Sequence, residues 1–363
     1  MTTQEDESQI RLDAKGDIGK MMAPGRVRTQ SLQGFDDDYT DIVDYIIRCT
    51  HKIWEEHSIG LIYTHYAHNV TVWTTSGRTY GRESLVESTL HSLAAFPNRR
   101  LYGDEVIWSG NDQDGFHTSH RFTSVAKNTG HSWYGPPTGQ ITTHSGIANC
   151  LVKENRIVEE WVVTDELGLL MQLGFDPRVT IEKFAQGSRR EGSQPREYSL
   201  PQRVVGQTVP VTMPPKASNG FDKAFDVEDF VRRSFHEIWN WRLLNKIDEY
   251  YDHDYVCHTT CERHLRGLGH FKAFVLTLLG AFSDAVMTIE HFYFMGNPTE
   301  GGGCRTMTRW NLQGTHKGAG PYGDPTGKPF YLMGISHHTI RAGRFVEEWT
   351  YFDEVSLMMQ LWK

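Results

Sequence analysis

Residues Phe345 to Leu361 read FVEEWTYFDEVSLMMQL, and most of this stretch has already occurred as RIVEEWVVTDELGLLMQL, from Arg156 to Leu173. Aligning the two places Asp165 on Asp353, 188 residues apart (353 − 165). In both copies the residues before the Asp alternate as in a strand, and those after it have helical spacing. Each Asp is therefore either a site residue at the end of a strand or the N-cap of the following helix.

The repeat extends through both halves of the chain. Trp54 corresponds to Trp239, 185 residues later (239 − 54), and the offset grows by only three residues across the domain. With 363 residues, a prior of 100 to 200 residues per domain also gives about two domains. We predict domains at 39–177 and 225–363, a flexible N-terminal arm at 1–38 and a linker at 178–224, because the last two ranges lack periodicity.

Composition and charge exclude several classes of function. The net charge of −8, without a basic stripe, argues against nucleic-acid binding. The N-terminus lacks the apolar core of a signal peptide, and no run approaches the roughly 18 apolar residues of a membrane span. A cytoplasmic protein without a membrane role and with five reduced cysteines is expected. Cys257, Cys261 and His264 lack the paired spacing of a zinc site, so no metal site is predicted.

The order of elements predicts the fold class. Each half begins with a helix, a short strand and a second helix, and then continues as successive strands separated by Gly, Asn and Pro turns. Helices followed by antiparallel strands indicate an α+β fold. A curved antiparallel sheet wrapped around the helices forms a cone with a pocket inside, and the chain is predicted to contain two such cones in tandem.

At this point the motifs resemble those of a known family. The first copy carries Ala95-Phe96-Pro97, Pro137-Thr138-Gly139, Glu160-Trp161, Asp165 and Gln172-Leu173-Gly174, whereas the second has Ser283 in place of the proline and ends Gln360-Leu361-Trp362. This set resembles the SnoaL-like polyketide cyclase family, which belongs to the superfamily of nuclear transport factor 2 and ketosteroid isomerase. The resemblance implies cystatin-like α+β cones, no cofactor, and a catalytic acid/base Asp at the positions of Asp165 and Asp353. The scaffold hosts many chemistries, so it does not identify a substrate.

The final hairpins predict which histidines lie near these acids. If Lys153 to Arg156 form a two-residue turn, His144 lies directly opposite Asp165 and the two form an acid/base dyad on the pocket face. A similar turn at Arg341 to Arg344 places His338 opposite Glu347 and Leu332 opposite Asp353. An error of one residue in either pairing would move every histidine to the other face. Asp165, Asp353, His144 and His338 are therefore the candidate catalytic residues, and a buried hydrogen-bonded pair is the alternative for each dyad.

Seven further residues are candidates for substrate binding. Trp73 and His258 match each other in the short strand that lines the cavity mouth in this fold, and Arg121 and Arg309 match each other before the Pro-Thr-Gly turn, where an Arg can hold a carboxylate or an enolate. The remaining three form the aromatic wall beside each Asp: Trp161, Trp349 and Tyr351. For each, a core position or a surface ion pair is the alternative.

These features predict a cofactor-independent enzyme that uses Asp and His for general acid/base chemistry in a hydrophobic cavity. Its substrate would be a small or medium carbonyl compound, and its reaction an aldol cyclisation, isomerisation or elimination. The alternative is a binding or assembly module without catalysis, and a third hypothesis is an aromatic cage for a quaternary ammonium group. Cones of this type pair through their sheets, so a homo-oligomer or an intramolecular pseudo-dimer is also expected.

Overall fold

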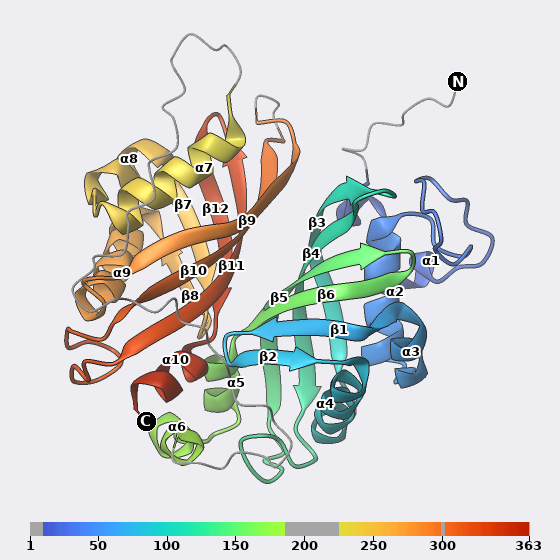
Figure 1. Cartoon of the computed structure of the whole chain (residues 1–363), viewed down its shortest axis with the longest axis horizontal. Coiled ribbons are helices and arrows are strands. Elements are labelled where there is room, and N and C mark those ends of the chain that lie inside the picture. The colour runs from blue at the N-terminus through green and yellow to red at the C-terminus, as the bar shows by residue number, and fades with distance from the viewer. Residues whose placement is uncertain (1–9, 186–224, 299–301, 363) are drawn as a thin grey trace. The chain divides into compact units, whose positions relative to one another are not determined.

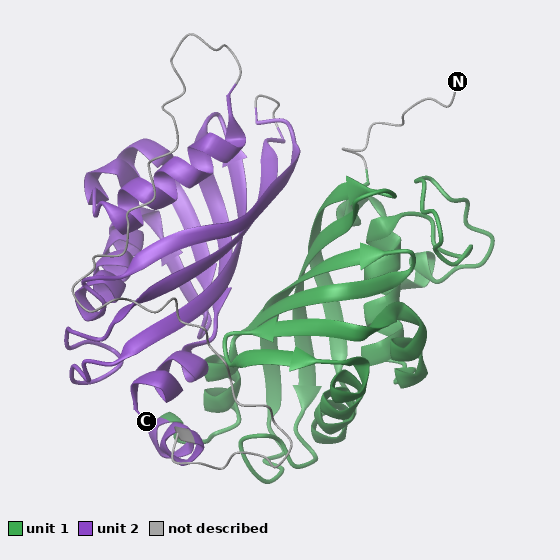
Figure 2. Ribbon diagram, viewed as in Figure 1, with its two compact units in different colours: residues 1–177 green, residues 178–363 purple. Residues whose placement is uncertain are grey.

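The computed structural model describes residues 10–185, 225–298 and 302–362. The chain divides into two compact units, residues 1–177 and residues 178–363 (Figure 2). Each unit has its own sheet of six strands. The described linker residues 178–185 are helical, and the rest of the predicted linker, 186–224, lies outside the described residues.

In unit 1 helices α2, α3 and α4 lie along one face of a sheet whose strand order is β2-β1-β6-β5-β4-β3 (Figure 1). Strands β1 and β6 are parallel, and every other neighbouring pair is antiparallel. The elements are η2 (Leu12–Ala14), α1 (Ile18–Met21), α2 (Ile42–Trp54), η3 (Ile59–Leu61), α3 (Ile62–His65), β1 (Tyr66–Thr74), β2 (Gly77–Tyr80), α4 (Arg82–Ala95), β3 (Arg100–Asn111), β4 (Gly115–Lys127), β5 (Ile141–Lys153), β6 (Arg156–Thr164) and α5 (Glu166–Gln172). Helix α6 (Pro177–Ala185) begins at the last residue of the unit.

Unit 2 repeats this topology, with the strand order β8-β7-β12-β11-β10-β9 and a single parallel pair, β12 and β7. Its elements are α7 (Val227–Phe235), the π-helix η4 (His236–Asn240), η5 (Leu244–Lys246), α8 (Ile247–Tyr250), β7 (Tyr251–Thr259), β8 (Arg263–Arg266), α9 (Gly267–Ala281), β9 (Val286–Gly296), β10 (Cys304–Thr315), β11 (Pro329–Arg341), β12 (Arg344–Phe352) and α10 (Glu354–Leu361). The predicted fold class, two tandem α+β cones, is confirmed. No helix in the described ranges has both the length and the apolar character needed to cross a membrane.

Local sequence signals explain where the helices begin and end. Asp41 caps α2, because its Oδ1 accepts a hydrogen bond from the backbone N–H of Asp44 at 3.0 Å. Helix α4 ends at Ala95, two residues before Pro97, which cannot continue a helix. The apolar face of α2 is buried, as its spacing predicts.

The final hairpins have the predicted turns but not the predicted register. Glu154 and Asn155 have φ values of 46° and 66°, as a two-residue hairpin turn requires. The pairing of β5 with β6 then shifts by one residue between Leu151 and Val152, and the pairing of β11 with β12 shifts in the same way between Thr339 and Ile340. A bulge of this kind adds one residue to one strand. Every cross-strand partner beyond the bulge is therefore displaced by one position from the prediction.

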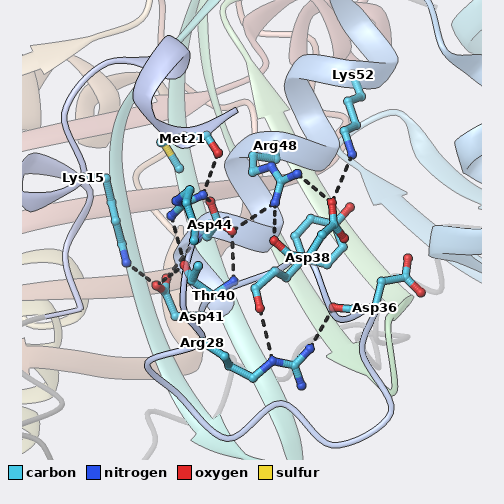
Figure 3. Close-up of polar contacts among 12 residues, drawn as sticks. Lys15, Met21, Arg28, Asp36, Asp38, Thr40, Asp41, Asp44, Arg48 and Lys52 are labelled. Carbon is cyan, nitrogen blue, oxygen red and sulfur yellow. Dashed lines mark hydrogen bonds and ion pairs between the residues drawn. The ribbon is translucent and has the colours of Figure 1, made fainter. Parts of the chain in front are cut away.

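Residues 10–38 were predicted to belong to a flexible arm, and this prediction is wrong for the described part of the arm. The segment packs against α2 through ion pairs to two buried carboxylates (Figure 3). Lys15 pairs with Asp41, and Arg26 pairs with Asp44, which also lies 3.3 Å from Nη1 of Arg48. The side chains of Asp41 and Asp44 are fully buried, so these cations compensate charges that would otherwise be costly to bury.

Candidate functional site

A cavity of about 300 Å³ lies in unit 1 between helices α2 and α4 and the sheet face that they cover. This volume is at the lower end of the range for small-molecule sites. Its walls are mainly apolar, with Ile46 and Ile53 on α2, Leu85 on α4, and Phe122 and Val162 on the sheet. The cavity therefore favours a hydrophobic ligand, and its few polar groups determine its chemistry.

Glu160 contributes a carboxyl group to the inner part of the cavity. It lies in the middle of β6, is only 9% exposed, and is surrounded by Cys49, Cys150 and Ile157, which are buried too. Burial raises the pKa of Glu160 to about 7, and the Cys150 thiol, which donates to Oε1 at 3.7 Å, opposes this only weakly. A carboxyl group with this pKa can both accept and return a proton near neutral pH.

A phenol lies in the same part of the cavity. Tyr66 begins β1 and lines the cavity, and its hydroxyl makes no hydrogen bond to any residue in the described part of the chain. Burial raises the pKa of Tyr66 well above its usual value, and the charge of Glu160 adds to this effect. The Tyr66 hydroxyl therefore stays protonated and can donate a hydrogen bond to a ligand oxygen.

A second polar group occupies the more exposed end of the cavity. His144 on β5 lines the cavity, with Nε2 3.5 Å from Oε1 of Glu166, the first residue of α5. Glu166 also accepts hydrogen bonds from the hydroxyls of Tyr134 and Thr164. Burial alone would raise the pKa of Glu166, but His144 and the two hydroxyls lower it to about 2. Glu166 is thus a fixed negative charge that orients His144.

Arg99 is the cation of the cavity lining. It follows α4, donates from Nη2 to Oγ of Ser92 at 2.8 Å, and stacks over the rings of Trp54 and Phe96. Burial lowers the pKa of Arg99 to about 10, and the charge of Glu166 counteracts part of this effect. Arg99 therefore remains protonated at neutral pH.

The corresponding cavity of unit 2 is almost filled. Its volume is about 30 Å³, compared with about 300 Å³ for the cavity of unit 1. Polar or small positions of the first cavity are occupied in unit 2 by apolar side chains. The replacements, each 185 to 188 residues further along the chain, are Thr50 by Phe235, Ser92 by Leu278, Arg99 by Ala285, Ser124 by Leu312, His144 by Leu332 and Thr164 by Phe352.

The carboxyl group at the equivalent position of unit 2 is held in a different state. Glu348 corresponds to Glu160, but it faces His338, whose Nε2 lies 3.6 Å from Oε2 of Glu348, and it accepts a hydrogen bond from the Tyr255 hydroxyl. Burial alone would raise the pKa of Glu348, yet the charge and hydrogen bond of His338 lower it overall. Unit 2 therefore contains a buried carboxyl group with a lowered pKa where the carboxyl group of unit 1 has a raised one.

The predicted pairing of His144 with Asp165 is wrong, because the bulge places Ser145 opposite Asp165, and the backbone N–H of Asp165 donates to the Ser145 carbonyl at 2.9 Å. Asp165 instead caps α5, with Oδ1 accepting from the backbone N–H of Gly168 at 3.0 Å. Neither Asp165 nor Asp353 is among the described residues that line the two cavities.

The second predicted pairing is displaced in the same way. His338 lies opposite Glu348 and not Glu347, and Gly334 lies opposite Phe352, the last residue of β12 before Asp353. Asp353 caps α10 by accepting from the backbone N–H of Ser356 at 2.9 Å. The helix-cap alternative therefore describes both aspartates, and their catalytic role stays a prediction.

Five of the predicted substrate-binding residues lie on the opposite sheet face from the cavities, because cavity-lining residues flank them on both sides along each strand: Trp73, Arg121, Trp161, Trp349 and Tyr351. Trp73 donates from Nε1 to Oε1 of Glu159 at 2.8 Å, and His258 stacks on Trp349. None of the seven predicted residues is among the described residues that line the two cavities, so the prediction that they line these pockets is wrong, and their role in substrate binding stays a prediction. The seven residues are Trp73, Trp161, Arg121, His258, Arg309, Trp349 and Tyr351.

The two arginines of this set take part in ion pairs, as the surface alternative proposed. Arg121 lies 3.6 Å from Asp104 and 3.9 Å from Glu105, and Nε of Arg309 lies 3.3 Å from Glu290. No group of three or more His, Cys, Asp or Glu side chains in the described ranges is arranged to hold a metal ion.

Four residues of the site were missed from the sequence: Glu160, Tyr66 and Arg99, which line the cavity, and Glu166, which lies beside His144. Glu160 belongs to the repeated Glu-Glu-Trp motif, and strand alternation places it on the face opposite Trp161. The signal was the isolated acid on the otherwise apolar face of a strand. Arg99 follows the Ala-Phe-Pro motif, and nothing in its local pattern distinguishes it from the exposed Arg100 beside it.

Comparison with solved structures finds relatives that each cover about one unit. A protein from Jannaschia sp. CCS1 described as a SnoaL-like polyketide cyclase is 18% identical, with a TM-score of 0.33 over 37% of this chain and 90% of its own. IdmH of Streptomyces antibioticus, assigned as a polyketide cyclase, is 24% identical, with a TM-score of 0.32 over 37% of this chain and 96% of its own. AclR of Streptomyces galilaeus, assigned as a hydroxylase, is 20% identical, with a TM-score of 0.32 over 37% of this chain and 98% of its own.

No curated protein sequence matches the chain. The model of one protein family, described as SnoaL-like polyketide cyclase, matches it twice, at residues 45–173 and 229–361. These two ranges together make up more than half of the chain and correspond to the two units. The chain therefore belongs to the SnoaL-like polyketide cyclase family, with two copies of the family domain in tandem.

Proposed function

We propose that unit 1 is an enzyme that moves a carbon-bound proton of a hydrophobic carbonyl compound, with Glu160 as the base. One observation carries the proposal: a carboxyl group with a pKa of about 7 lies inside a mainly apolar cavity of small-molecule size. A base with this pKa is about half ionised at neutral pH, where general acid/base catalysis is most effective. Family membership supports a cyclase-type reaction in general terms.

The Glu160 carboxylate would remove a proton from the carbon next to a substrate carbonyl. The electrons of the C–H bond then form an enolate, whose oxygen accepts a hydrogen bond from the Tyr66 hydroxyl. In an aldol cyclisation the enolate carbon attacks a second carbonyl of the same molecule, and protonated Glu160 returns its proton to the new alkoxide. The electrons and the proton balance within these steps, which use only groups of the protein and the substrate.

A proton-exchange assay tests this proposal without knowledge of the natural substrate. Hydrophobic aryl ketones and 1,3-diketones are first selected by thermal shift, and the loss of the α-proton signal in D₂O is then followed by NMR. Replacing Glu160→Gln should slow exchange by about 10²- to 10⁴-fold, the usual contribution of a positioned base. Exchange at the wild-type rate in this variant would refute the role of Glu160.

A matched control lies next to it on the same strand. Glu159 has its side chain on the opposite face, where it accepts the hydrogen bond from Trp73. A glutamine at this position keeps an acceptor oxygen, so Glu159→Gln should leave exchange unchanged. Equal losses in Glu159→Gln and Glu160→Gln would indicate a general effect on the strand and would also refute the proposal.

For unit 2 we propose a non-catalytic copy, because its cavity has only about a tenth of the volume of the first cavity and the pKa of the acid at the equivalent position is lowered by His338. Exchange should therefore survive Glu348→Gln. Since this change leaves His338 without its partner and can destabilise unit 2, Thr350→Val serves as a second, milder variant in the same cavity. Loss of exchange in both folded variants would place catalysis in unit 2 instead.

A further inference from the structure

We propose that the substrate of unit 1 carries a carboxylate that binds Arg99, so that the ligand is a keto acid with an apolar body. This inference deepens the proposed function and rests on it, because it assigns one end of the same cavity to the anionic group of the substrate. It starts from the observation that Arg99 has more hydrogen-bond donors than the protein provides acceptors for in the described residues.

Arg99 uses few of its hydrogen-bond donors within the protein. A guanidinium group has five N–H donors. In the described part of the chain, Nη2 of Arg99 donates to Ser92, whereas Nε and Nη1 have no partner. In the same described residues, no carboxylate oxygen lies within 4.0 Å of a guanidinium nitrogen of Arg99, which is the limit for an ion pair. A partly buried cation whose donors are mostly unused is poised for an anion supplied by a ligand.

The guanidinium group of Arg99 is held in place although most of its donors are unused. The guanidinium lies 5.0 Å from the centre of the Trp54 ring and 5.7 Å from that of Phe96. Trp54, Ser92 and Arg99 itself all line the cavity. A planar donor group fixed by stacking loses little conformational entropy when it binds a carboxylate with two parallel hydrogen bonds.

Arg99 lies toward the opposite end of the cavity from Glu160. Its pKa responds to the charge of Glu166, which follows the end of β6 at Thr164. Glu160 precedes Thr164 by four residues on β6. At roughly 3.3 Å per residue, the strand therefore extends about 13 Å from Glu160 to the end of the cavity near Glu166. Residues at the Arg99 end, including His144 and Thr164, are partly exposed, whereas Glu160 and Cys150 are buried. A bound keto acid would thus have its carboxylate near the entrance and its reacting carbon inside.

Unit 2 supports the assignment by contrast. The residue equivalent to Arg99 is Ala285, in the unit whose cavity is almost filled. The residue directly before this position makes the same hydrogen bond in both copies. Asn98 accepts from the backbone N–H of Lys127, and the equivalent Asp284 accepts from the backbone N–H of Thr315. The loop is therefore conserved in structure between the copies, and the arginine occurs only in the copy with an open cavity.

The test uses a series of ω-phenyl-ω-oxoalkanoic acids of increasing chain length, each compared with its methyl ester by calorimetric titration of the full chain. The wild type should bind the best acid about 10- to 100-fold more tightly than its ester, as expected for hydrogen bonds to a charged group. Arg99→Met keeps the apolar stem over Trp54 and should abolish this preference, whereas Arg99→Lys should retain part of it. Arg100→Met removes an exposed neighbouring cation that pairs with Glu55 and should leave the preference unchanged.

Equal binding of acid and ester by the wild type, or a preference that survives in Arg99→Met, would overturn the inference. Proton exchange measured on the same samples separates it from the proposed function. Glu160→Gln should stop exchange and keep the preference for acids, Arg99→Met should abolish that preference, and Arg100→Met should keep both exchange and preference. A preference for acids without any exchange in the wild type would refute the proposed function and leave Arg99 as an anion-binding residue.

Discussion

Cys150 and Glu160 lie opposite each other on β5 and β6, with Sγ 3.7 Å from Oε1, and the equivalent pair in unit 2 is His338 and Glu348. The two carboxyl groups have pKa values that move in opposite directions. Burial raises that of Glu160 to about 7, whereas His338 lowers that of Glu348 despite similar burial. The residue across the sheet is thus the largest cause of the lowered pKa of Glu348, and hydrogen bonds from Tyr255 and Ser336 add to its effect.

Replacing Cys150→His should therefore convert the first acid toward the state of the second. The pKa of Glu160 should fall well below 7, and the lower inflection of the pH profile for proton exchange should move to lower pH with it. The maximal rate should also fall, since a weaker base removes a proton less readily. Cys150→Ala removes the thiol without adding a charge and should leave the inflection near 7; the same downward shift in both variants would contradict this explanation.

The raised pKa of Glu160 also predicts a pH-dependent cost in stability. Between pH 4.5, the ordinary value, and about 7, the unfolded chain loses this proton while the folded chain keeps it, so stability falls as pH rises. Above pH 7 the cost reaches about 3 kcal/mol, from 1.36 kcal/mol per pKa unit. The free energy of unfolding of Glu160→Gln, measured in urea, is compared with that of the wild type at pH 4 and at pH 8. Between these pH values the difference should change in favour of the variant by up to about this amount. A difference that does not change with pH would mean that Glu160 titrates normally.

Substitutions of Asp165 separate a helix cap from a catalytic acid. Asn is as good an N-cap as Asp, so Asp165→Asn should keep both stability and proton exchange if the residue only caps α5. Asp165→Ala should lose about 1 kcal/mol of unfolding free energy, because the backbone N–H of Gly168 loses its acceptor. A folded Asp165→Asn variant without exchange activity would instead support the family-based prediction of a catalytic role.

The N-terminal segment is predicted to stabilise unit 1 through its cations. Arg26→Met removes a partner of the buried Asp44 carboxylate and should lower the free energy of unfolding by about 2 kcal/mol, the typical value for a hydrogen bond to a charged group. Arg11 is a matched control, since it pairs with the exposed Asp13. Arg11→Met should change stability by less than about 0.5 kcal/mol, and equal effects of the two substitutions would show that the ion pair to Asp44 contributes nothing specific.

The fold was predictable from the sequence because its signals are local and occur twice. The alternation before Asp165 and the helical spacing after it set the last strand and helix, and Asp41 and Pro97 set helix boundaries. The two-residue turn at Glu154 and Asn155 was also predictable, since Asn tolerates positive φ. Such signals need no knowledge of distant contacts.

The site was less predictable because it depends on one inserted residue and on which sheet face is covered. The register shift between Leu151 and Val152 moves His144 from Asp165 to Glu166, and no residue type in the two strands predicts this bulge. Alternation showed that Glu160 and Trp161 lie on opposite faces but not which face meets the helices. The aromatic face was taken as the pocket wall, whereas the helices cover the face that carries Glu160.

The most direct test of the central claim is a carboxyl titration by NMR on protein labelled with ¹³C at the side-chain carboxyl of glutamate. The wild type should show one glutamate resonance that titrates with a pKa of about 7, and that resonance should be missing from Glu160→Gln and present in Glu159→Gln. If every glutamate of the folded wild type titrates near the ordinary value of 4.5 or below it, the cavity contains no base suited to neutral pH and the proposed mechanism is wrong.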